Sequence, residues 1–115
     1  MPAQDRDESP SSDRLQRLVD RVVERMRPEA VWLIGSRAEH RARPDSDYDL
    51  LVVMPDGTPV ADLDPVKAWE VARGLEVPAD IVPCTRTEFE EEKGEIDTLP
   101  RAAVSRGKLL YDQIA

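Results

Sequence analysis

Two short apolar runs in the first half of the chain decide what kind of core it can build. Residues 30–34 read Ala-Val-Trp-Leu-Ile and end at Gly35, and residues 50–53 read Leu-Leu-Val-Val. A continuous apolar run of this length, bounded by turn residues, is typical of a strand buried on both faces. We therefore expect two central strands, over 30–34 and 47–54, in a sheet flanked by helices.

Apolar residues at helical spacing occur on both sides of these strands in the sequence. Between Ser12 and Pro28 they recur at three- and four-residue steps, which predicts an amphipathic helix that Ser12 caps and the proline ends. The same spacing predicts a helix over 64–74, with Trp69 packed on the sheet. These two helices can cover the buried strands.

Two further helices are predicted by their capping residues. Thr85 and Glu88 have the spacing of a capping box, so a helix should run from there to Lys93. A last helix is expected over 99–106, because a proline lies in its first turn and Gly107 follows its end. The second half of the chain therefore adds helices to the fold.

Two shorter strands complete the predicted sheet. Residues 77–82 form a third strand that should end at Pro83, and residues 108–111 form a closing strand at a sheet edge. The alternation of strands and helices predicts one α/β (α+β) domain over 12–115 with a short mixed sheet. Residues 1–11 lack periodicity and are predicted to be a disordered leader.

Composition excludes several classes of protein. With 115 residues and a mass of 13.0 kDa, the chain is long enough for one core only. Its net charge of -8 would repel a phosphate backbone, so we expect no direct nucleic-acid binding. No run of about 18 apolar residues and no signal sequence is present, which predicts a cytoplasmic protein without a membrane span. The single cysteine, Cys84, cannot form an internal disulfide and is expected to be half-buried.

Three aspartates stand out against the apolar strands. Asp47 and Asp49 are two residues apart, so in a strand their carboxylates would point to the same face. Such a pair suits Mg²⁺, which binds one or two carboxylates together with substrate phosphates. Asp80, in the third predicted strand, is the natural third carboxylate. Each aspartate taken singly is better explained as a turn cap or an exposed residue, but together they indicate a site, because acidic residues in apolar strands are otherwise unfavourable.

The turn after the first strand supplies the other half of this site. Gly35 allows a tight turn, and the amides and hydroxyl that follow at Ser36 can hold a phosphate. Arg37 comes next and could pair with a phosphate, although a surface role is almost as well supported. A lone Gly-Ser pair is a weak signal, whereas its combination with the aspartate pair ten residues later is far more specific.

This combination resembles the signature of the nucleotidyltransferase superfamily that includes DNA polymerase beta. The resemblance rests on Gly35-Ser36, a ten-residue spacer and Asp47-Tyr48-Asp49. Small size, Asp80 and the ending over 105–111 are similar to the minimal nucleotidyltransferase branch. That branch implies the nucleotidyltransferase fold. Many of its members are antitoxins paired with a helical HEPN-domain protein, and some transfer AMP from ATP to a tyrosine of that partner.

The resemblance also implies roles for individual residues. Asp47 and Asp49 would be metal ligands, and Asp80 would help to bind metal and take the proton from the attacking hydroxyl. Gly35 and Ser36 would hold the triphosphate of ATP. The chain departs from its relatives at 39–41, which read Glu-His-Arg where relatives often have a glycine.

Two alternatives to this enzyme remain open from sequence. The first is a non-catalytic antitoxin that neutralises its partner by covering it, although such an inhibitor needs no carboxylate triad. The second is a nucleotidyltransferase that acts on a small molecule, which usually carries a further helical domain to hold the acceptor. The sequence leaves open the nucleotide, the acceptor and the oligomeric state, and an oligomer is compatible with it.

Overall fold

The two predicted central strands lie side by side in the middle of the sheet. The computed structural model describes residues 10–113 and leaves out 1–9 and 114–115. Strand β1 (Ala30–Ile34) pairs antiparallel with β2 (Tyr48–Met54). Strand β3 (Ala79–Thr85) lies parallel to the other edge of β2, and β4 (Lys108–Asp112) lies antiparallel to β1. The order β3-β2-β1-β4 confirms the predicted mixed sheet and places β4 at an edge.

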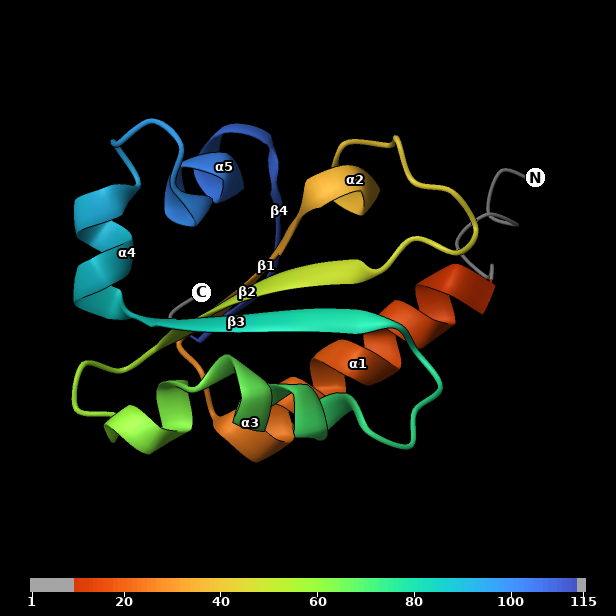
Figure 1. The fold of residues 1–115 in the computed structure, drawn as a ribbon, viewed down its shortest axis with the longest axis horizontal. Helices are drawn as coiled ribbons and strands as arrows, with labels where there is room; N and C mark the ends of the chain where they lie inside the picture. The colour runs from red at the N-terminus through yellow and green to blue at the C-terminus, as the bar shows by residue number, and fades with distance from the viewer. Residues whose placement is uncertain (1–9, 114–115) are drawn as a thin grey trace.

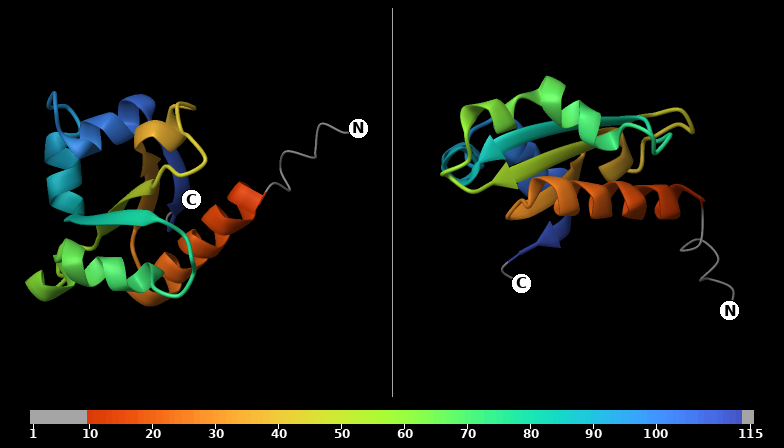
Figure 2. Two further views of the ribbon diagram at one scale, coloured as in Figure 1. Left: turned by 45° about the vertical axis from the view of Figure 1, so that its right-hand side comes forward. Right: turned by 90° about the horizontal axis from the view of Figure 1, so that it is seen from below.

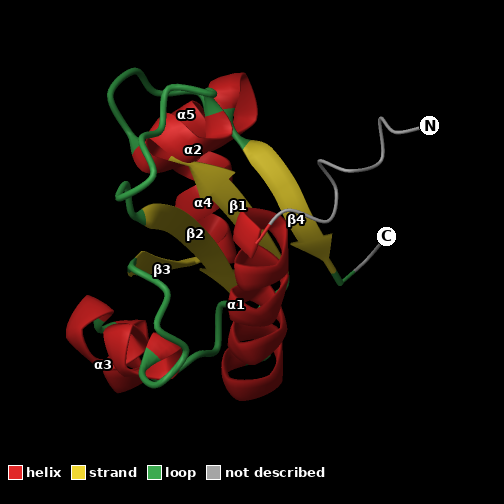
Figure 3. Ribbon diagram, turned by 90° about the vertical axis from the view of Figure 1, so that its right-hand side faces the viewer, coloured by secondary structure: helices red, strands yellow, loops and turns green. Residues whose placement is uncertain are grey.

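Helices cover both faces of this sheet (Figures 1 and 3). One face carries α1 and the segment made of η2, α3 and η3, and the other carries α4 and α5. The bounds of the helices, with the short α2 that follows β1, are α1 (Pro10–Met26), α2 (Gly35–Ala38), η2 (Val60–Leu63), α3 (Pro65–Trp69), η3 (Glu70–Ala72), α4 (Arg86–Glu92) and α5 (Leu99–Arg106). This arrangement confirms the predicted α/β class.

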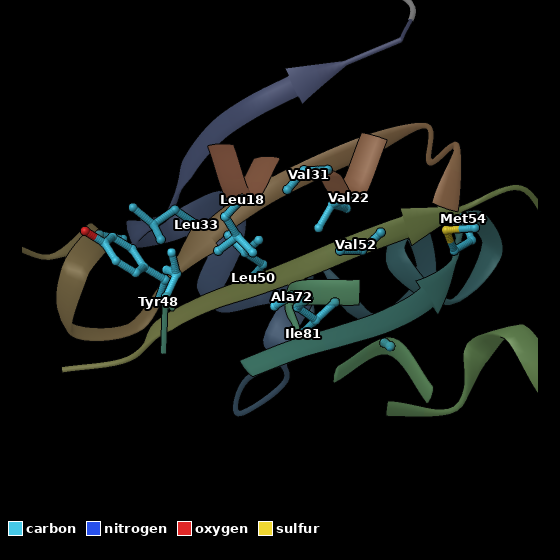
Figure 4. Close-up of a cluster of buried hydrophobic side chains, with 13 residues drawn as sticks. Leu18, Val22, Val31, Leu33, Tyr48, Leu50, Val52, Met54, Ala72 and Ile81 are labelled. Carbon is cyan, nitrogen blue, oxygen red and sulfur yellow. The ribbon is translucent and has the colours of Figure 1, made fainter. Parts of the chain in front are cut away.

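Alternate residues of the central strands build two separate cores. Val31 and Leu33 of β1 point toward α1, where they meet the fully buried Leu18 (Figure 4). Their neighbours Ala30 and Ile34 point to the opposite face and pack with a cluster that includes Phe89 of α4. Side chains two apart in a strand share a face, so continuous apolar runs are needed when both faces are covered.

The helix over 64–74 differs from its prediction. It is broken into α3, which ends at Trp69, and the 3₁₀ turn η3. Ala68 and Ala72 point into the core four residues apart, and a residue next to Ala68 lies about 100° around the helix from it. Trp69 is therefore turned outward, is 53% exposed and stacks under the Arg73 guanidinium instead of packing on the sheet.

The predicted boundaries of the first helix and the third strand also move. Helix α1 begins at Pro10 instead of Ser12, so two residues of the predicted leader are helical, and residues 1–9 of that leader lie outside the described residues. The third strand covers 79–85 instead of 77–82 and includes Pro83. A proline is tolerated there because β3 is an edge strand, where one side of the backbone needs no strand partner.

The predicted caps of the last two helices are confirmed, whereas Ser12, predicted to cap the first helix, lies inside α1. Thr85 accepts a hydrogen bond from the Glu88 amide, and the Glu88 carboxylate accepts one from the Thr85 amide, which completes the predicted capping box of α4. Helix α5 spans the predicted residues and is capped by the Thr98 hydroxyl. Among the helices of the described residues, none has the length and apolar character needed to cross a membrane.

Candidate active site

All the predicted site residues lie at one end of the sheet, on the right in Figure 1. Strand β1 ends at Ile34 there, and α2 starts immediately afterwards with Gly35. Because β2 runs antiparallel to β1, it begins at this same end, and Asp49 pairs with Ile34. Strand β3 runs parallel to β2 and also begins here, so Asp80 lies directly opposite Asp49. Neighbouring strands are about 4.8 Å apart, which brings these two aspartates together.

Gly35 is needed at this end for two independent reasons. Its backbone φ is +76°, a left-handed conformation that glycine adopts without strain. A Cβ on residue 35 would also overlap the Asp49 carboxylate oxygen Oδ2. The turn after β1 therefore fits closely around the central carboxylate of the site, and an alanine would disturb both the turn and Asp49.

The three carboxylates act on one another electrostatically. Partial burial raises the pKa of Asp49 above its ordinary value, and the negative charges of Asp80 and Asp47 raise it further. Asp47 and Asp80 are exposed, while Asp49 is half-buried between them. In the described part of the chain, no lysine or arginine lies within salt-bridge distance of these three side chains.

Asp47 reaches the site from a loop instead of a strand. Strand β2 begins at Tyr48, one residue later than predicted, so Asp47 is the last residue of the loop that precedes it. Tyr48 itself is buried and packs in the core on the α1 face, as its alternation with the aspartates predicts. The loop that carries Asp47 therefore decides where its carboxylate lies relative to Asp49.

The donor set fits a cation that is shared with a substrate. Three carboxylates with uncompensated charge suit a hard divalent ion. Within residues 10–113, however, no three His, Cys, Asp or Glu side chains are grouped closely enough to hold a metal by themselves. Magnesium commonly binds one or two carboxylates and completes its shell with water and phosphate oxygens, so the pair Asp49 and Asp80 is compatible with Mg²⁺ that arrives with a nucleotide.

The residues of the short helix α2 face different surroundings. Ser36 is half-buried in its first turn, and its carbonyl accepts the Arg41 amide at 2.9 Å. The guanidinium of Arg37 donates to the carbonyl oxygens of Pro44 and Ser46. The predicted contacts of Ser36 and Arg37 with a phosphate stay predictions, and the Arg37 guanidinium already has backbone partners.

The segment 39–41 has an unusual backbone. His40 is exposed, as predicted, and has a φ of 59°, in the left-handed region that glycine favours. Glu39 lies 3.4 Å from Arg106 at the end of α5 and 3.4 Å from Arg41. The contact between Glu39 and Arg106 had no signal in the sequence, because the two residues are 67 positions apart.

Cys84 lies away from this site, toward the other end of β3. It is half-buried, as predicted, and burial together with the charges of Glu88 and Glu92 raises the pKa of its thiol to about 12. A thiol with such a pKa is protonated at neutral pH and is a poor nucleophile. The cysteine is therefore a packing residue and takes no part in the candidate site.

The family is decided by a match to the nucleotidyltransferase domain model over residues 15–110. The chain belongs to the nucleotidyltransferase domain family. That match confirms the predicted fold and the predicted enzyme class, a nucleotidyltransferase. No curated protein sequence matches the chain significantly.

Solved structures share this fold. A protein assigned as a nucleotidyltransferase from Sulfolobus solfataricus matches with a TM-score of 0.61 and 20% identity over 89% of this chain and 80% of that one. A toxin-antitoxin complex with AMP-PNP matches with a TM-score of 0.55 and 16% identity, covering 84% of this chain and 73% of that one. A mutant of the toxin-antitoxin pair MntA-HpeT matches with a TM-score of 0.56 and 14% identity, covering 84% and 72%. At these identities the likeness concerns the fold.

Proposed function

We propose that this nucleotidyltransferase moves AMP from ATP to a hydroxyl of a partner protein, with Mg²⁺ as cofactor. The acceptor is a tyrosine of a HEPN-domain toxin, and the chain acts as the antitoxin in the cytoplasm. One observation carries the proposal: the Asp49 carboxylate is seated against Gly35 with Asp80 opposite it in register, and burial together with the charge of Asp80 raises the pKa of Asp49. Such uncompensated carboxylates are typical of sites that receive cations.

Each residue has a defined task in this reaction. Asp47 and Asp49 would hold Mg²⁺, which supplies Lewis-acid stabilisation of the phosphate charge when bound. The turn at Gly35 and Ser36 orients the triphosphate. Asp80 accepts the proton of the acceptor hydroxyl, whose oxygen forms a bond to the α-phosphorus. The bond from that phosphorus to the bridging oxygen of the β-phosphate breaks, and pyrophosphate leaves.

The openness of the site supports a large acceptor. Asp47 and Asp80 are exposed at the end of the sheet, where a surface side chain of another protein can approach them. Two of the structures with this fold are toxin-antitoxin complexes, and one of these contains AMP-PNP, an analogue of ATP. Both facts agree with a partner protein as acceptor and with an adenine nucleotide as donor.

The direct test is transfer of label from ATP. The protein is incubated with α-³²P-labelled ATP, Mg²⁺ and the product of the neighbouring gene, and each polypeptide is examined for label. We expect label on the partner, and none with the variant Asp47→Asn/Asp49→Asn. Asp45→Asn is the matched control, because Asp45 is an exposed carboxylate in the same loop. Absence of label on any protein, with all four nucleoside triphosphates, would overturn the enzymatic proposal.

A steric antitoxin is the second candidate, and exposed apolar side chains favour it. Leu99 and Val104 of α5 and Leu109 of β4 are each more than 40% exposed. Apolar residues of this kind can bury against a partner. If Asp47→Asn/Asp49→Asn still neutralises the partner as well as the wild type does, covering the toxin is sufficient and transfer is not the means of neutralisation.

A further inference from the structure

The guanidinium of Arg37 contacts the loop that carries Asp47 on both sides of that aspartate. Before Asp47, Nη2 donates to the Ser46 carbonyl at 2.9 Å and to the Pro44 carbonyl at 3.2 Å, and Nε donates to Ser46 at 3.3 Å. After Asp47, the ring of Tyr48 lies under the guanidinium, 4.3 Å from its central carbon. Residues 44–48 are thus held by one side chain.

These contacts occupy one of the edges that an arginine can offer to an anion. Nε and Nη2 form the planar fork that binds carboxylates and phosphates with two parallel hydrogen bonds. In this chain, the fork points to the carbonyl oxygens of Pro44 and Ser46. To bind a phosphate with this fork, Arg37 would have to release the loop, so the geometry favours a role within the protein.

Asp47 depends on this support because it lies outside the strand. The backbone of Tyr48 is fixed by its amide, which donates to the Pro78 carbonyl at 2.9 Å. On the other side, Ser46 is fixed by its amide contact with Arg43 and by the Arg37 fork. Releasing the fork would loosen the segment before Asp47, whose remaining contacts are those of Ser46 with the Arg43 backbone, while leaving β2 in place.

We propose that Arg37 is a positioning residue that holds the loop over 44–46, and thereby sets the Asp47 carboxylate beside Asp49. This inference deepens the proposed function, because it concerns a ligand of the proposed metal site. In this role Arg37 acts by positioning Asp47, whereas the sequence suggested a direct contact between Arg37 and a phosphate. Outer residues that orient metal ligands typically change metal affinity by about 10- to 100-fold when they are removed.

Amide hydrogen exchange tests the structural half of this proposal without any ligand. In Arg37→Gln, the amide of Ser46, which donates to the Arg43 carbonyl, should exchange about tenfold faster, because the charge-assisted bonds from Arg37 that hold this turn are lost. Arg37→Lys should restore little of the protection against exchange, since an ammonium cannot both span the two carbonyls and stack on Tyr48. The matched control is Arg43→Gln, which removes an exposed arginine from the same loop. Wild-type exchange rates in Arg37→Gln would overturn the proposal.

Titration with Mn²⁺ and AMP-PNP tests the functional half. We expect Arg37→Gln to weaken Mn²⁺ binding about tenfold with Asp47 present and to have no further effect in an Asp47→Asn background. A phosphate contact predicts the opposite result, with weaker AMP-PNP binding even without metal and an additive effect in the double variant. That result would overturn the positioning role. If the wild type itself binds neither Mn²⁺ nor AMP-PNP, the proposed function fails, and the exchange experiment still decides the role of Arg37.

In the transfer assay at saturating Mg²⁺, loss of positioning should lower kcat and leave the KM for ATP unchanged. Binding of ATP through the turn at Gly35 does not involve the Arg37 fork, whereas the geometry of Asp47 matters for the reaction. An increase of KM at constant kcat would overturn the proposal. The thermal unfolding midpoint of Arg37→Gln, compared with that of Arg43→Gln, separates this effect from a general loss of stability.

Discussion

The two ends of the central strands carry similar carboxylates in opposite environments. At the end where β2 begins, Asp47, Asp49 and Asp80 repel one another, and the pKa of Asp49 is raised. At the end where β2 stops, the pKa of Asp56 is lowered because its carboxylate accepts hydrogen bonds from the amide and hydroxyl of Thr87. We call the end with Asp47, Asp49 and Asp80 the site end and the end with Asp56 the anchored end.

Ion pairs reinforce the anchored end, on the left in Figure 1. Arg86 at the start of α4 contacts Glu29 at 2.9 Å, just before β1, and Glu90 at 3.1 Å, one turn further along the helix. Glu90 also pairs with Lys93, which lowers the pKa of Glu90. One end of the sheet therefore satisfies its charges within the chain, and the other leaves negative charge for something that binds there.

The largest effect should come from adding one methyl group to the site end. Gly35→Ala forces an L-residue into a left-handed conformation, which costs about 1–2 kcal/mol, and overlap with Asp49 adds about 1–3 kcal/mol. Chemical denaturation should therefore show a loss of about 2–5 kcal/mol in the free energy of unfolding.

Two controls separate these causes. Gly57→Ala should have little effect, because a Cβ there meets nothing within 4 Å. In an Asp49→Ser background, Gly35→Ala should cost less than in the wild type, since the carboxylate that the methyl overlaps has been removed. Equal costs in both backgrounds would mean that Asp49 is not seated against the turn. Figure 2 shows α2, the short helix that begins at Gly35, from two further directions.

A smaller effect is expected when the anchored end loses its central cation. Arg86→Met keeps most of the side-chain stem but removes the contacts with Glu29 and Glu90, and unfolding should become easier by about 1–2 kcal/mol. Arg41→Met is the matched control, because the Arg41 side chain is 61% exposed and its pair with Glu39 measures 3.4 Å. A loss as large for Arg41→Met would contradict the contrast between the two ends.

The sequence predicts the parts of both ends that depend on local patterns. The apolar runs reveal β1 and β2, and the spacing of Thr85 and Glu88 reveals the start of α4, because burial and capping impose periodicities on nearby residues. The placement of Gly35 near Asp49 follows from antiparallel pairing of adjacent strands. Local order in the sequence is thus enough to bring most of the candidate site together.

Contacts between distant or irregular segments were not predictable. The outward turn of Trp69 depends on where a helix changes to a 3₁₀ turn, and the sequence marks no such point. The hydrogen bonds from Arg37 to the loop over 44–46 depend on how that loop folds back. The pairing of Glu39 with Arg106 depends on how α5 packs near α2. Arginine can donate to a phosphate or to a carbonyl, so its identity alone does not select a partner.

Two Asp→Asn substitutions should shift stability in opposite directions. Asp49 has a raised pKa, so its ionised form destabilises the fold at pH 7, and stability should rise as the pH falls through the folded-state pKa. Asp56 has a lowered pKa, so its charge stabilises the fold above the unfolded-state pKa, and that contribution is lost as the pH falls through the folded-state value. In EDTA at pH 7, Asp49→Asn should therefore unfold at a higher temperature than wild type, and Asp56→Asn at a lower one.

A pH series checks the sign of both effects. The difference in unfolding temperature between each variant and wild type should shrink as the pH falls to the range in which both aspartates are protonated in wild type. If Asp49→Asn is less stable than wild type at neutral pH, its carboxylate has a stabilising partner, and the site end is not a region of uncompensated charge.

The smallest effect concerns backbone strain at the site end. His40 holds a left-handed conformation that costs an L-residue about 1–2 kcal/mol, and glycine removes this cost but loses about 0.4–1 kcal/mol through the freedom of the unfolded chain. His40→Gly should therefore stabilise the protein by about 0.5 kcal/mol, measured by denaturation. Arg43→Gly, in the same loop at a residue without positive φ, should destabilise it instead. Equal signs for the two substitutions would show that residue 40 is not strained.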